Sequence, residues 1–384
     1  MHDSNDSRVR TVDLRSDTVT RPTPAMRAAM MAAELGDDVF GDDPSVNALQ
    51  DQMAALLGFE GALFVPTGTQ SNLCAILAHC QRGDEYIVGQ MAHCYRWEGG
   101  GAAVLGSVQP QPLSHQADGT LALSDIEAAI KPDDAHFART RLLALENTLG
   151  GKLLPWDYLQ QATDLARRKG LARHLDGARL FNAAVAQAAL SGGDVPAAGP
   201  PLGGHSPLGG QRSTRSGERG GDIFLEARRI AQCFDSVSVC LSKGLGAPVG
   251  SVLCGSRAFL SRAHRIRKMA GGGMRQAGML AAAGSYALDH HVARLADDHA
   301  LAMRLAQGLR DIPGLSVELP DTNIVFVDLV GDAQARSAEL LAGLALQGVL
   351  ATAGLYRLRF VTHLDLDAAG IDHVLAVLRD FLVA

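Results

Sequence analysis

Short apolar runs alternate along most of the chain with longer stretches of helical periodicity. Residues 234–241 read FDSVSVCL, in which valines and a leucine alternate with serines and a cysteine, a pattern typical of a buried strand. Similar strand-like runs lie at 62–65, 84–88, 141–145 and 171–175. Helical periodicity occurs between them, at 45–57, 70–80, 155–169, 223–232 and 256–269. This alternation predicts an α/β fold with a mostly parallel sheet covered by helices on both faces.

The pattern also predicts how the chain divides into domains. We expect a disordered tail at 1–11, a large domain at 12–275, and then, at 276–384, a long linking helix and a smaller C-terminal α/β domain. The clearest strands of that smaller domain lie at 324–329 and 355–362. Residues 191–222 are dense in Gly, Pro and Ser and bury too little apolar surface to offset their chain entropy, which predicts a disordered surface insertion.

Composition narrows the class of protein. The chain has 384 residues, of which 47% are hydrophobic and 20% charged, as in a globular protein. A net charge of −6 argues against nucleic acid and against an anionic membrane surface as partners. No apolar run is long enough to span a membrane, the first ten residues lack the apolar core of a signal peptide, and the six cysteines form no C-x-x-C motif. These features predict a cytoplasmic protein with reduced cysteines.

Lys243 stands directly after the strand at 234–241, among small residues. Partial burial disfavours an ammonium ion, so a lysine held there offers a free amine for covalent chemistry. The alternative is a lysine whose side chain simply extends from the strand end to solvent. Taken alone, this stretch favours the second interpretation.

Other polar residues occupy equivalent strand-end positions. Thr67, Gly68 and Thr69 form a turn between a strand and a helix, a geometry that aims free backbone N–H groups at an anion. His93 and Asp176 each follow a further strand. An ordinary helix cap and a structural histidine are the alternatives. However, parallel sheets gather functional residues beyond the carboxyl ends of their strands, so the convergence predicts one site.

Two further motifs suggest sites that we discount. The acidic stretch at 36–45, GDDVFGDDPS, lacks the spacing of a calcium loop, so we expect no metal. The stretch at 244–250, GLGAPVG, superficially matches a dinucleotide fingerprint, but a strand follows it instead of a helix.

The chain resembles the low-specificity L-threonine aldolases, which are pyridoxal-phosphate-dependent enzymes of the aspartate aminotransferase fold (fold type I). The motifs that carry this resemblance are VDLRSDTVTRPT, GDDVFGDDPSVNALQ, FVPTGTQSNL, HLDGARLFNA, CLSKGLGAPVGS, KMAGGGMRQ and RFVTHLD. They run in the family's order from residue 12 to residue 365. The resemblance implies a large domain with a mostly parallel seven-stranded sheet, a pyridoxal 5′-phosphate cofactor, and cleavage of L-threonine or L-allo-threonine to glycine and acetaldehyde.

The resemblance also implies a role for each matching residue. Lys243 bonds covalently to the cofactor, Asp176 pairs with the ring nitrogen, and His93 stacks on the ring. The phosphate and the substrate are held by Thr67, Gly68, Thr69, Arg179, Ser16 and Arg359, with Lys268 close by. His93, or a water held by His93 and His136, is the candidate base.

The family further implies a homotetramer with active sites shared between subunits, in which 36–44 and 268–276 are candidate contacts. Phe40 replaces a common tyrosine, Leu149-Gly150 replaces a common His-Asn pair, and the insertion at 191–222 is foreign to the pattern. These departures leave threonine, allo-threonine and phenylserine open as preferred substrates. The alternative functions are a β-eliminating lyase, a serine hydroxymethyltransferase-like enzyme or an aminotransferase on the same fold, and a non-catalytic amino-acid sensor.

Overall fold

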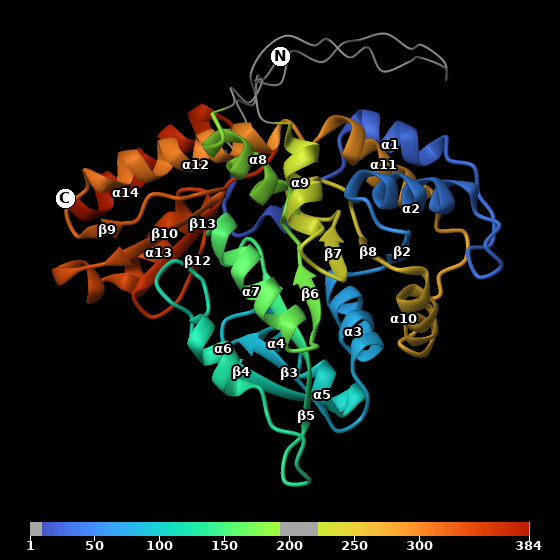
Figure 1. Ribbon diagram of the computed structural model, residues 1–384. Helices are drawn as coiled ribbons and strands as arrows, with labels where there is room; N and C mark the ends of the chain where they lie inside the picture. The colour runs from blue at the N-terminus through green and yellow to red at the C-terminus, as the bar shows by residue number, and fades with distance from the viewer. Residues whose placement is uncertain (1–9, 193–221, 384) are drawn as a thin grey trace.

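A computed structural model describes residues 10–192 and 222–383 of the chain (Figure 1). The predicted disorder of the tail and of the insertion therefore lies almost wholly outside the described residues. Across the described part, no helix combines the length and apolar character needed to cross a bilayer.

The large domain is built on a seven-stranded sheet in the order β2-β8-β7-β6-β5-β3-β4. Its strands are β2 (Gly61–Val65), β3 (Asp84–Gly89), β4 (Gln109–Leu113), β5 (Arg139–Glu146), β6 (Ala172–Asp176), β7 (Ser236–Cys240) and β8 (Ser251–Gly255). Every neighbouring pair is parallel except the two pairs that β8 makes. The predicted mostly parallel sheet is confirmed.

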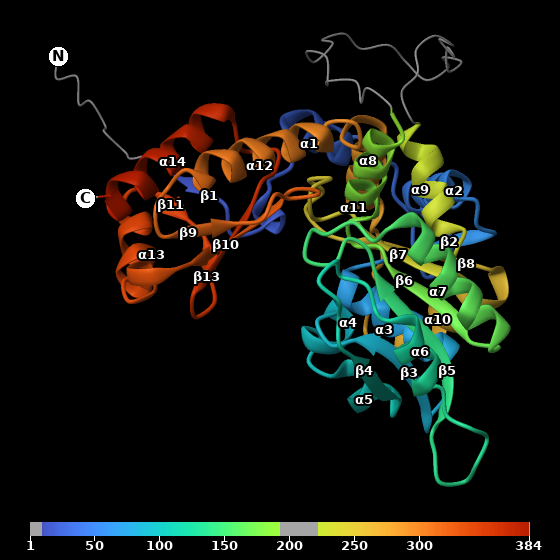
Figure 2. The ribbon, with the colours of Figure 1, turned by 60° about the vertical axis from the view of Figure 1, so that its left-hand side comes forward.

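Helices cover both faces of this sheet (Figures 1 and 2). They are α1 (Pro24–Met31), α2 (Pro44–Leu57), α3 (Gly68–His79), α4 (His93–Arg96), α5 (Gly101–Gly106), α6 (Leu123–Ala129), α7 (Trp156–Arg168), α8 (Leu180–Leu190), α9 (Ile223–Ala231), α10 (Arg257–Met269) and α11 (Gly278–His290). Strand β5 illustrates the layering, because Leu143 and Leu145 enter one core whereas Leu142 and Ala144 enter another. Successive side chains of a strand point to opposite faces, so both faces of the sheet are buried.

The smaller domain has an antiparallel sheet in the order β12-β13-β10-β9. Its elements are β9 (Leu315–Val317), β10 (Ile324–Leu329), β11 (Val349–Leu350), β12 (Thr352–Ala353), β13 (Arg357–Val361), α12 (Leu295–Arg310), α13 (Ser337–Leu346), α14 (Ala368–Val383) and the 3-10 turn η2 (Gly331–Gln334). Strand β1 (Val12–Asp13), from the start of the chain, pairs in parallel with β11.

Core packing exchanges segments between the two domains near both ends of the described chain. Helix α11 packs on α1 and α2, and residues 277–295 contribute to the core of the large domain. Val12 and Leu14 instead belong to the core of the smaller domain. The described part of the chain therefore begins in the small domain and passes the 3-10 turn η1 (Asp17–Val19) before it enters the large one. This crossing brings residues 15–20 to the junction of the two domains.

Candidate active site

Asp176 ends β6 and is 2% exposed. Its Oδ1 accepts a hydrogen bond from the backbone N–H of Ala178 at 3.1 Å, and its Oδ2 accepts one from Nδ2 of Asn72 at 2.7 Å. Asn72 lies in α3, directly after the predicted anion-binding turn. The carboxylate is thus held in place by one donor on each oxygen.

His93 is the first residue of α4 and faces the same region. Its backbone N–H donates to Oε2 of Glu146 at 2.7 Å, and its ring Nδ1 lies 2.8 Å from Oε1 of Glu98. The hydrogen bond to Glu98 raises the pKa of His93, although partial burial opposes the rise. His93, Glu98 and Asp176 place ligand atoms within 4.8 Å of one another. The structure therefore brings His93 and Asp176 together.

Two acidic residues at this edge were not predicted as site residues. Burial and the nearby Asp176 raise the pKa of Glu146 to about 7, and burial also raises the pKa of Glu98. Glu146 ends β5 and so has the same strand-end signal that identified Asp176. Glu98 follows α4 in a glycine-rich loop and carries no comparable signal.

The predicted anion-binding turn begins α3. Thr67 is the N-cap and accepts a hydrogen bond from the backbone N–H of Gln70 at 3.0 Å, while Thr69 is exposed. The first turn carries no acidic residue. A Cβ on Gly68 would lie 2.6 Å from Sγ of Cys240, so only glycine lets the turn pack against the end of β7. Free N–H groups, hydroxyls and the helix dipole together suit a phosphate.

Lys243 lies in the loop that follows β7 and is half-buried. Its carbonyl accepts hydrogen bonds from Oγ1 of Thr20 at 3.2 Å and from the backbone N–H of Gly246 at 2.8 Å. The positive charge of Lys243 lowers the pKa of Asp17 and opposes the rise in the pKa of Glu146. Lys243 therefore lies near Asp176 and His93, and its covalent role stays a prediction.

Arg179 follows β6 and forms a two-point ion pair with Asp17. Its Nε donates to Oδ2 at 2.8 Å and its Nη2 donates to Oδ1 at 2.6 Å. Ser16, the N-cap of η1, lies beside this pair and accepts a hydrogen bond from the backbone N–H of Thr18 at 3.2 Å. The sequence predicted Arg179 and Ser16 but not Asp17, which accepts two of the donors of Arg179 and leaves Nη1 for another partner.

Arg359 comes from β13 of the smaller domain. Its Nη1 donates to the carbonyl of Arg15 at 3.1 Å, and burial together with the neighbouring charge of Arg179 lowers its pKa to about 10. Among the described residues, no carboxylate forms an ion pair with it. Arg357, on the same strand, instead pairs with Asp328 at 3.1 Å. Of these two arginines, Arg359 is therefore the one whose guanidinium is available to a ligand, and its role in substrate binding stays a prediction.

Two predicted residues are not brought into the site of their own chain. His136 precedes the amino end of β5, has a side chain that is 88% exposed, and bonds to Asp134. The other site residues gather at the carboxyl ends of the parallel strands. His136 precedes β5 and therefore lies at the opposite ends of these strands. This corrects the expectation that it holds a water with His93 in one subunit.

Lys268 is exposed near the end of α10, and within the described part of the chain its side chain forms no hydrogen bond or ion pair. The loop after it reaches the anion-binding turn, because Nε2 of Gln70 donates to the carbonyl of Ala270 at 3.1 Å. Lys268 therefore lies beside the turn without joining it.

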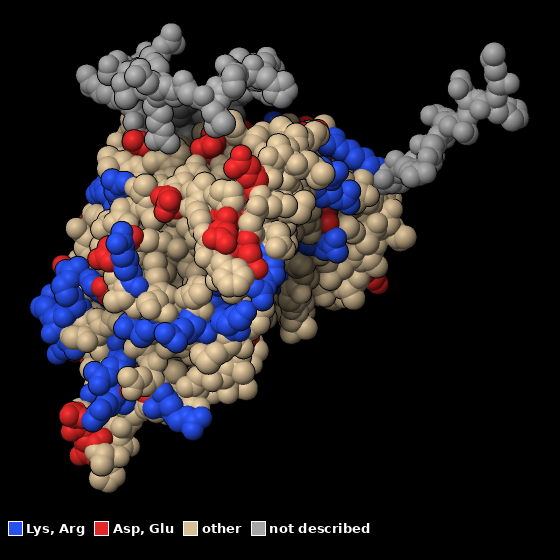
Figure 3. Space-filling model, turned by 90° about the vertical axis from the view of Figure 1, so that its right-hand side faces the viewer, with Lys and Arg blue, Asp and Glu red and all other residues tan. Residues whose placement is uncertain are grey.

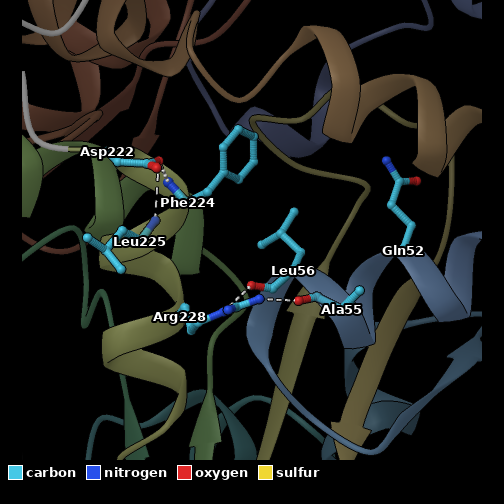
Figure 4. A pocket seen from close by; sticks show the side chains of 7 residues that line it. All are labelled: Gln52, Ala55, Leu56, Asp222, Phe224, Leu225 and Arg228. Atoms are coloured by element: carbon cyan, nitrogen blue, oxygen red, sulfur yellow. Dashed lines mark hydrogen bonds between the residues drawn. The ribbon is translucent and has the colours of Figure 1, made fainter. Parts of the chain in front are cut away.

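A separate hollow of about 390 Å³ lies between α2 and α9 (Figure 4). Arg228 donates there to the carbonyls of Ala55 and Leu56, at the last turn of α2. The residues that line it are Gln52, Ala55, Leu56, Asp222, Phe224, Leu225 and Arg228, none of which was predicted as a site residue. We assign the chemistry to the strand ends instead.

The residues at the strand ends fit pyridoxal phosphate. The turn at Thr67–Thr69 offers donors for a phosphate, the carboxylate of Asp176 suits a protonated ring nitrogen, and Lys243 offers an amine. Asp176 and Glu98 already accept hydrogen bonds from Asn72, so the cluster that they form with His93 reads as a hydrogen-bonded network. The prediction that no metal is required stays a prediction.

Comparison with known proteins agrees with this assignment. The family model of the β-eliminating lyases matches residues 13–332. The low specificity L-threonine aldolase of Escherichia coli K12 is 51% identical over 371 residues, which cover 97% of this chain and 99% of that protein. The probable low-specificity L-threonine aldolase 2 of Arabidopsis thaliana is 42% identical over 377 residues, 96% of each chain.

A solved structure of Leishmania major threonine aldolase matches with a TM-score of 0.73 over 96% of this chain and 98% of that one. At 20% identity, this likeness supports the fold alone. Taken with the site geometry, the sequence relatives show that the chain belongs to the β-eliminating lyase family, among the low-specificity L-threonine aldolases.

Proposed function

We propose that this protein cleaves L-threonine and L-allo-threonine to glycine and acetaldehyde with pyridoxal phosphate as its cofactor. The observation that carries the proposal is Arg359, a partly buried guanidinium without a carboxylate partner in the described part of the chain. A substrate carboxylate completes that pairing. The donor thus orients an amino acid toward the side of the site that holds Lys243.

Each remaining residue has a separate task. The bound cofactor supplies an electron sink for the carbon that loses its bond. Thr67, Gly68 and Thr69 hold the phosphate, and Asp176 provides the negative charge behind the ring nitrogen. Lys243 would supply the amine that binds the cofactor covalently.

His93 is positioned to take up a proton. It lies within 4.8 Å of Asp176 and is oriented through its Nδ1 by Glu98, which leaves Nε2 to face a ligand. We assign to this nitrogen the removal of the proton from the β-hydroxyl group. Ser16 and the remaining donors of Arg179 assist Arg359 in holding the substrate.

A coupled assay for aldehyde release tests the proposal with the L- and D-isomers of threonine and allo-threonine. We expect cleavage of the L-isomers only, with glycine as the second product. Pyruvate with ammonia would indicate a β-eliminating lyase, and a keto acid would indicate an aminotransferase. Lys243→Ala should abolish turnover and the visible absorbance of the bound cofactor, and wild-type activity in that variant would contradict the assignment.

We also propose a homotetramer whose active sites lie at subunit interfaces. The two loops with family motifs pack together, since Asp37 pairs with Arg275 at 3.1 Å and the backbone N–H of Asp38 donates to the carbonyl of Arg275 at 3.3 Å. Large apolar side chains are exposed on and beside them, namely Met31, Leu35, Phe40 and Met269. Figure 3 shows a band of Lys and Arg side chains across one face of the molecule. Helix α10 carries Arg267 and Lys268 in its last turn, next to the second loop.

An interface of this kind would bury the apolar side chains and bring charge from a second subunit toward the anion-binding turn. Light scattering of the holoenzyme tests the oligomeric state, and Phe40→Asp should shift it toward smaller species.

The six free cysteines, of which five are buried, support our proposal that the protein works in the cytoplasm.

A further inference from the structure

The side-chain amide of Asn72 lies between two buried carboxylates. Its Nδ2 donates to Oδ2 of Asp176 at 2.7 Å and to Oε1 of Glu98 at 2.8 Å. Asn72 is 2% exposed, and both hydrogens of its amide group are donated to these two carboxyl groups inside the protein. Glu98 also accepts from Nδ1 of His93 at 2.8 Å. Nδ2 of Asn72 therefore links Asp176, the proposed partner of the cofactor ring, to Glu98, which orients His93.

The orientation of this amide is set from behind by His174. Oδ1 of Asn72 lies 3.1 Å from Nε2 of His174, and a carbonyl oxygen can only accept, so Nε2 must carry the hydrogen. Burial lowers the pKa of His174 to about 4, which leaves the ring neutral. Nδ1 is then an acceptor, and it lies 2.8 Å from Oγ of Ser236. An inverted amide would place an oxygen against two carboxylates.

The chain of hydrogen bonds continues from Ser236 to His79. Ser236 donates its hydroxyl hydrogen to His174, so its oxygen accepts from Nε2 of His79 at 2.8 Å. Burial lowers the pKa of His79 to about 3, and its ring stacks on Phe259 with centroids 4.5 Å apart. Every donor in this chain of hydrogen bonds consequently points toward Asp176.

We infer that Asn72 is a positioning residue that holds the carboxyl groups of Asp176 and Glu98 side by side, and that His174 holds Asn72 in the required orientation. The inference rests on the proposed role of Asp176 at the cofactor ring. The titratable groups that interact with Asp176 come from the α4 region and the strand ends: His93, Cys94, Glu98, Glu146, His174 and Cys240.

Asn72→Asp tests the inference, because it preserves the shape of the side chain and replaces the donor by a third carboxyl group. That group is tolerated only when it carries a proton. We therefore expect the dissociation constant for pyridoxal phosphate, measured by absorbance without substrate, to rise about tenfold or more relative to wild type at pH 9 and by much less at pH 6. Asn72→Ala should show a smaller loss that does not depend on pH.

Asn182→Asp is the matched control. Asn182 is 3% exposed and likewise bonds to a histidine, His299, at 3.2 Å, but it contacts neither Asp176 nor Glu98. Its variant should keep the wild-type dependence of cofactor affinity on pH. If Asn72 only fills space, Asn72→Asp will be milder than Asn72→Ala at both pH values, and the inference fails.

A second measurement needs no substitution. The ¹⁵N chemical shifts of His174 in the wild-type protein should report a neutral ring with its hydrogen on Nε2, and a hydrogen on Nδ1 would overturn the inference even if the variants do not fold. Cofactor titration and these shifts require no amino acid substrate. A failure to cleave threonine would therefore count against the proposed function and not against the role of Asn72.

Discussion

Asp17 and Arg179 form a buried ion pair at the junction of the two domains. The carboxylate of Asp17 is fully buried and accepts hydrogen bonds from Nε and Nη2 of Arg179. Burial alone would raise the pKa of Asp17, but the charge of Arg179 holds it well below its ordinary value. The pair therefore stays ionised at neutral pH, and its contribution to stability is lost only as the pH falls far into the acid range.

Asp17→Asn should strongly destabilise the protein, because it leaves the buried charge of Arg179 without its counter-charge. We expect a loss of about 3–5 kcal/mol in the free energy of unfolding. Denaturant unfolding of the cofactor-free protein at pH 7 measures it. Asp328→Asn is the control, since it breaks the half-exposed pair with Arg357 and should cost about 0–1 kcal/mol. Equal losses in both variants would contradict this account.

Arg359→Ala should raise KM for threonine by about tenfold to a hundredfold, because it removes the charged donor for the substrate carboxylate. Arg359→Lys should recover part of that loss, since an ammonium retains the charge but not the two-point geometry. Steady-state kinetics measure both. Arg357→Ala, on the same strand, should leave KM within about twofold of wild type. A larger effect there would move carboxylate binding to Arg357.

Much of this site could be predicted from sequence because its residues follow apolar strands. Asp176 and Lys243 each come after such a run, and a parallel sheet brings the carboxyl ends of its strands to one edge. Strand β4 was missed because it reads QPQPL, and prolines disfavour a strand. It lies at the edge of the sheet, where a missing N–H is tolerated.

The partners of these residues could not be predicted in the same way. Asp17 lies 162 positions from Arg179, and Asn72 lies 104 positions from Asp176, so only the packed fold creates their contacts. His136 was predicted from the family resemblance alone. It precedes its strand, and the structure places it at the amino end of β5, away from the carboxyl ends where the other site residues lie.

Glu98→Gln should shift the pH dependence of catalysis. The hydrogen bond from Nδ1 of His93 to Glu98 raises the pKa of His93, and a base must be neutral to accept a proton. Removing the charge of Glu98 should therefore move the acid limb of the profile of kcat/KM to lower pH. Glu85→Gln is the control, because the carboxyl group of Glu85 is also buried but bonds to Thr140 and Gln109 elsewhere on the sheet. An unchanged acid limb in Glu98→Gln would exclude His93 as the titrating base.

His136→Ala should leave kcat within about twofold of wild type, as for most substitutions of exposed residues. The residue is exposed and lies at the amino end of β5, so it contacts no ligand in its own chain. Single-turnover and steady-state rates measure the effect. A loss of tenfold or more, on the order of 1.4 kcal/mol, would mean that the loop reaches the active site of a neighbouring subunit.

Glu146→Gln should weaken the dependence of stability on pH. Burial and Asp176 raise the pKa of Glu146 to about 7 in the folded protein, against an ordinary value of 4.5. Between these values the unfolded chain has released this proton while the folded protein still holds it, so stability falls as the pH rises from about 5 to 7. Glutamine cannot titrate, yet its oxygen can still accept the backbone hydrogen bond from His93. Denaturant unfolding of the cofactor-free protein at several pH values should show that the difference in stability between variant and wild type grows with pH across this range and levels off above it. A constant difference would place the proton of this cluster on another group, such as Glu98.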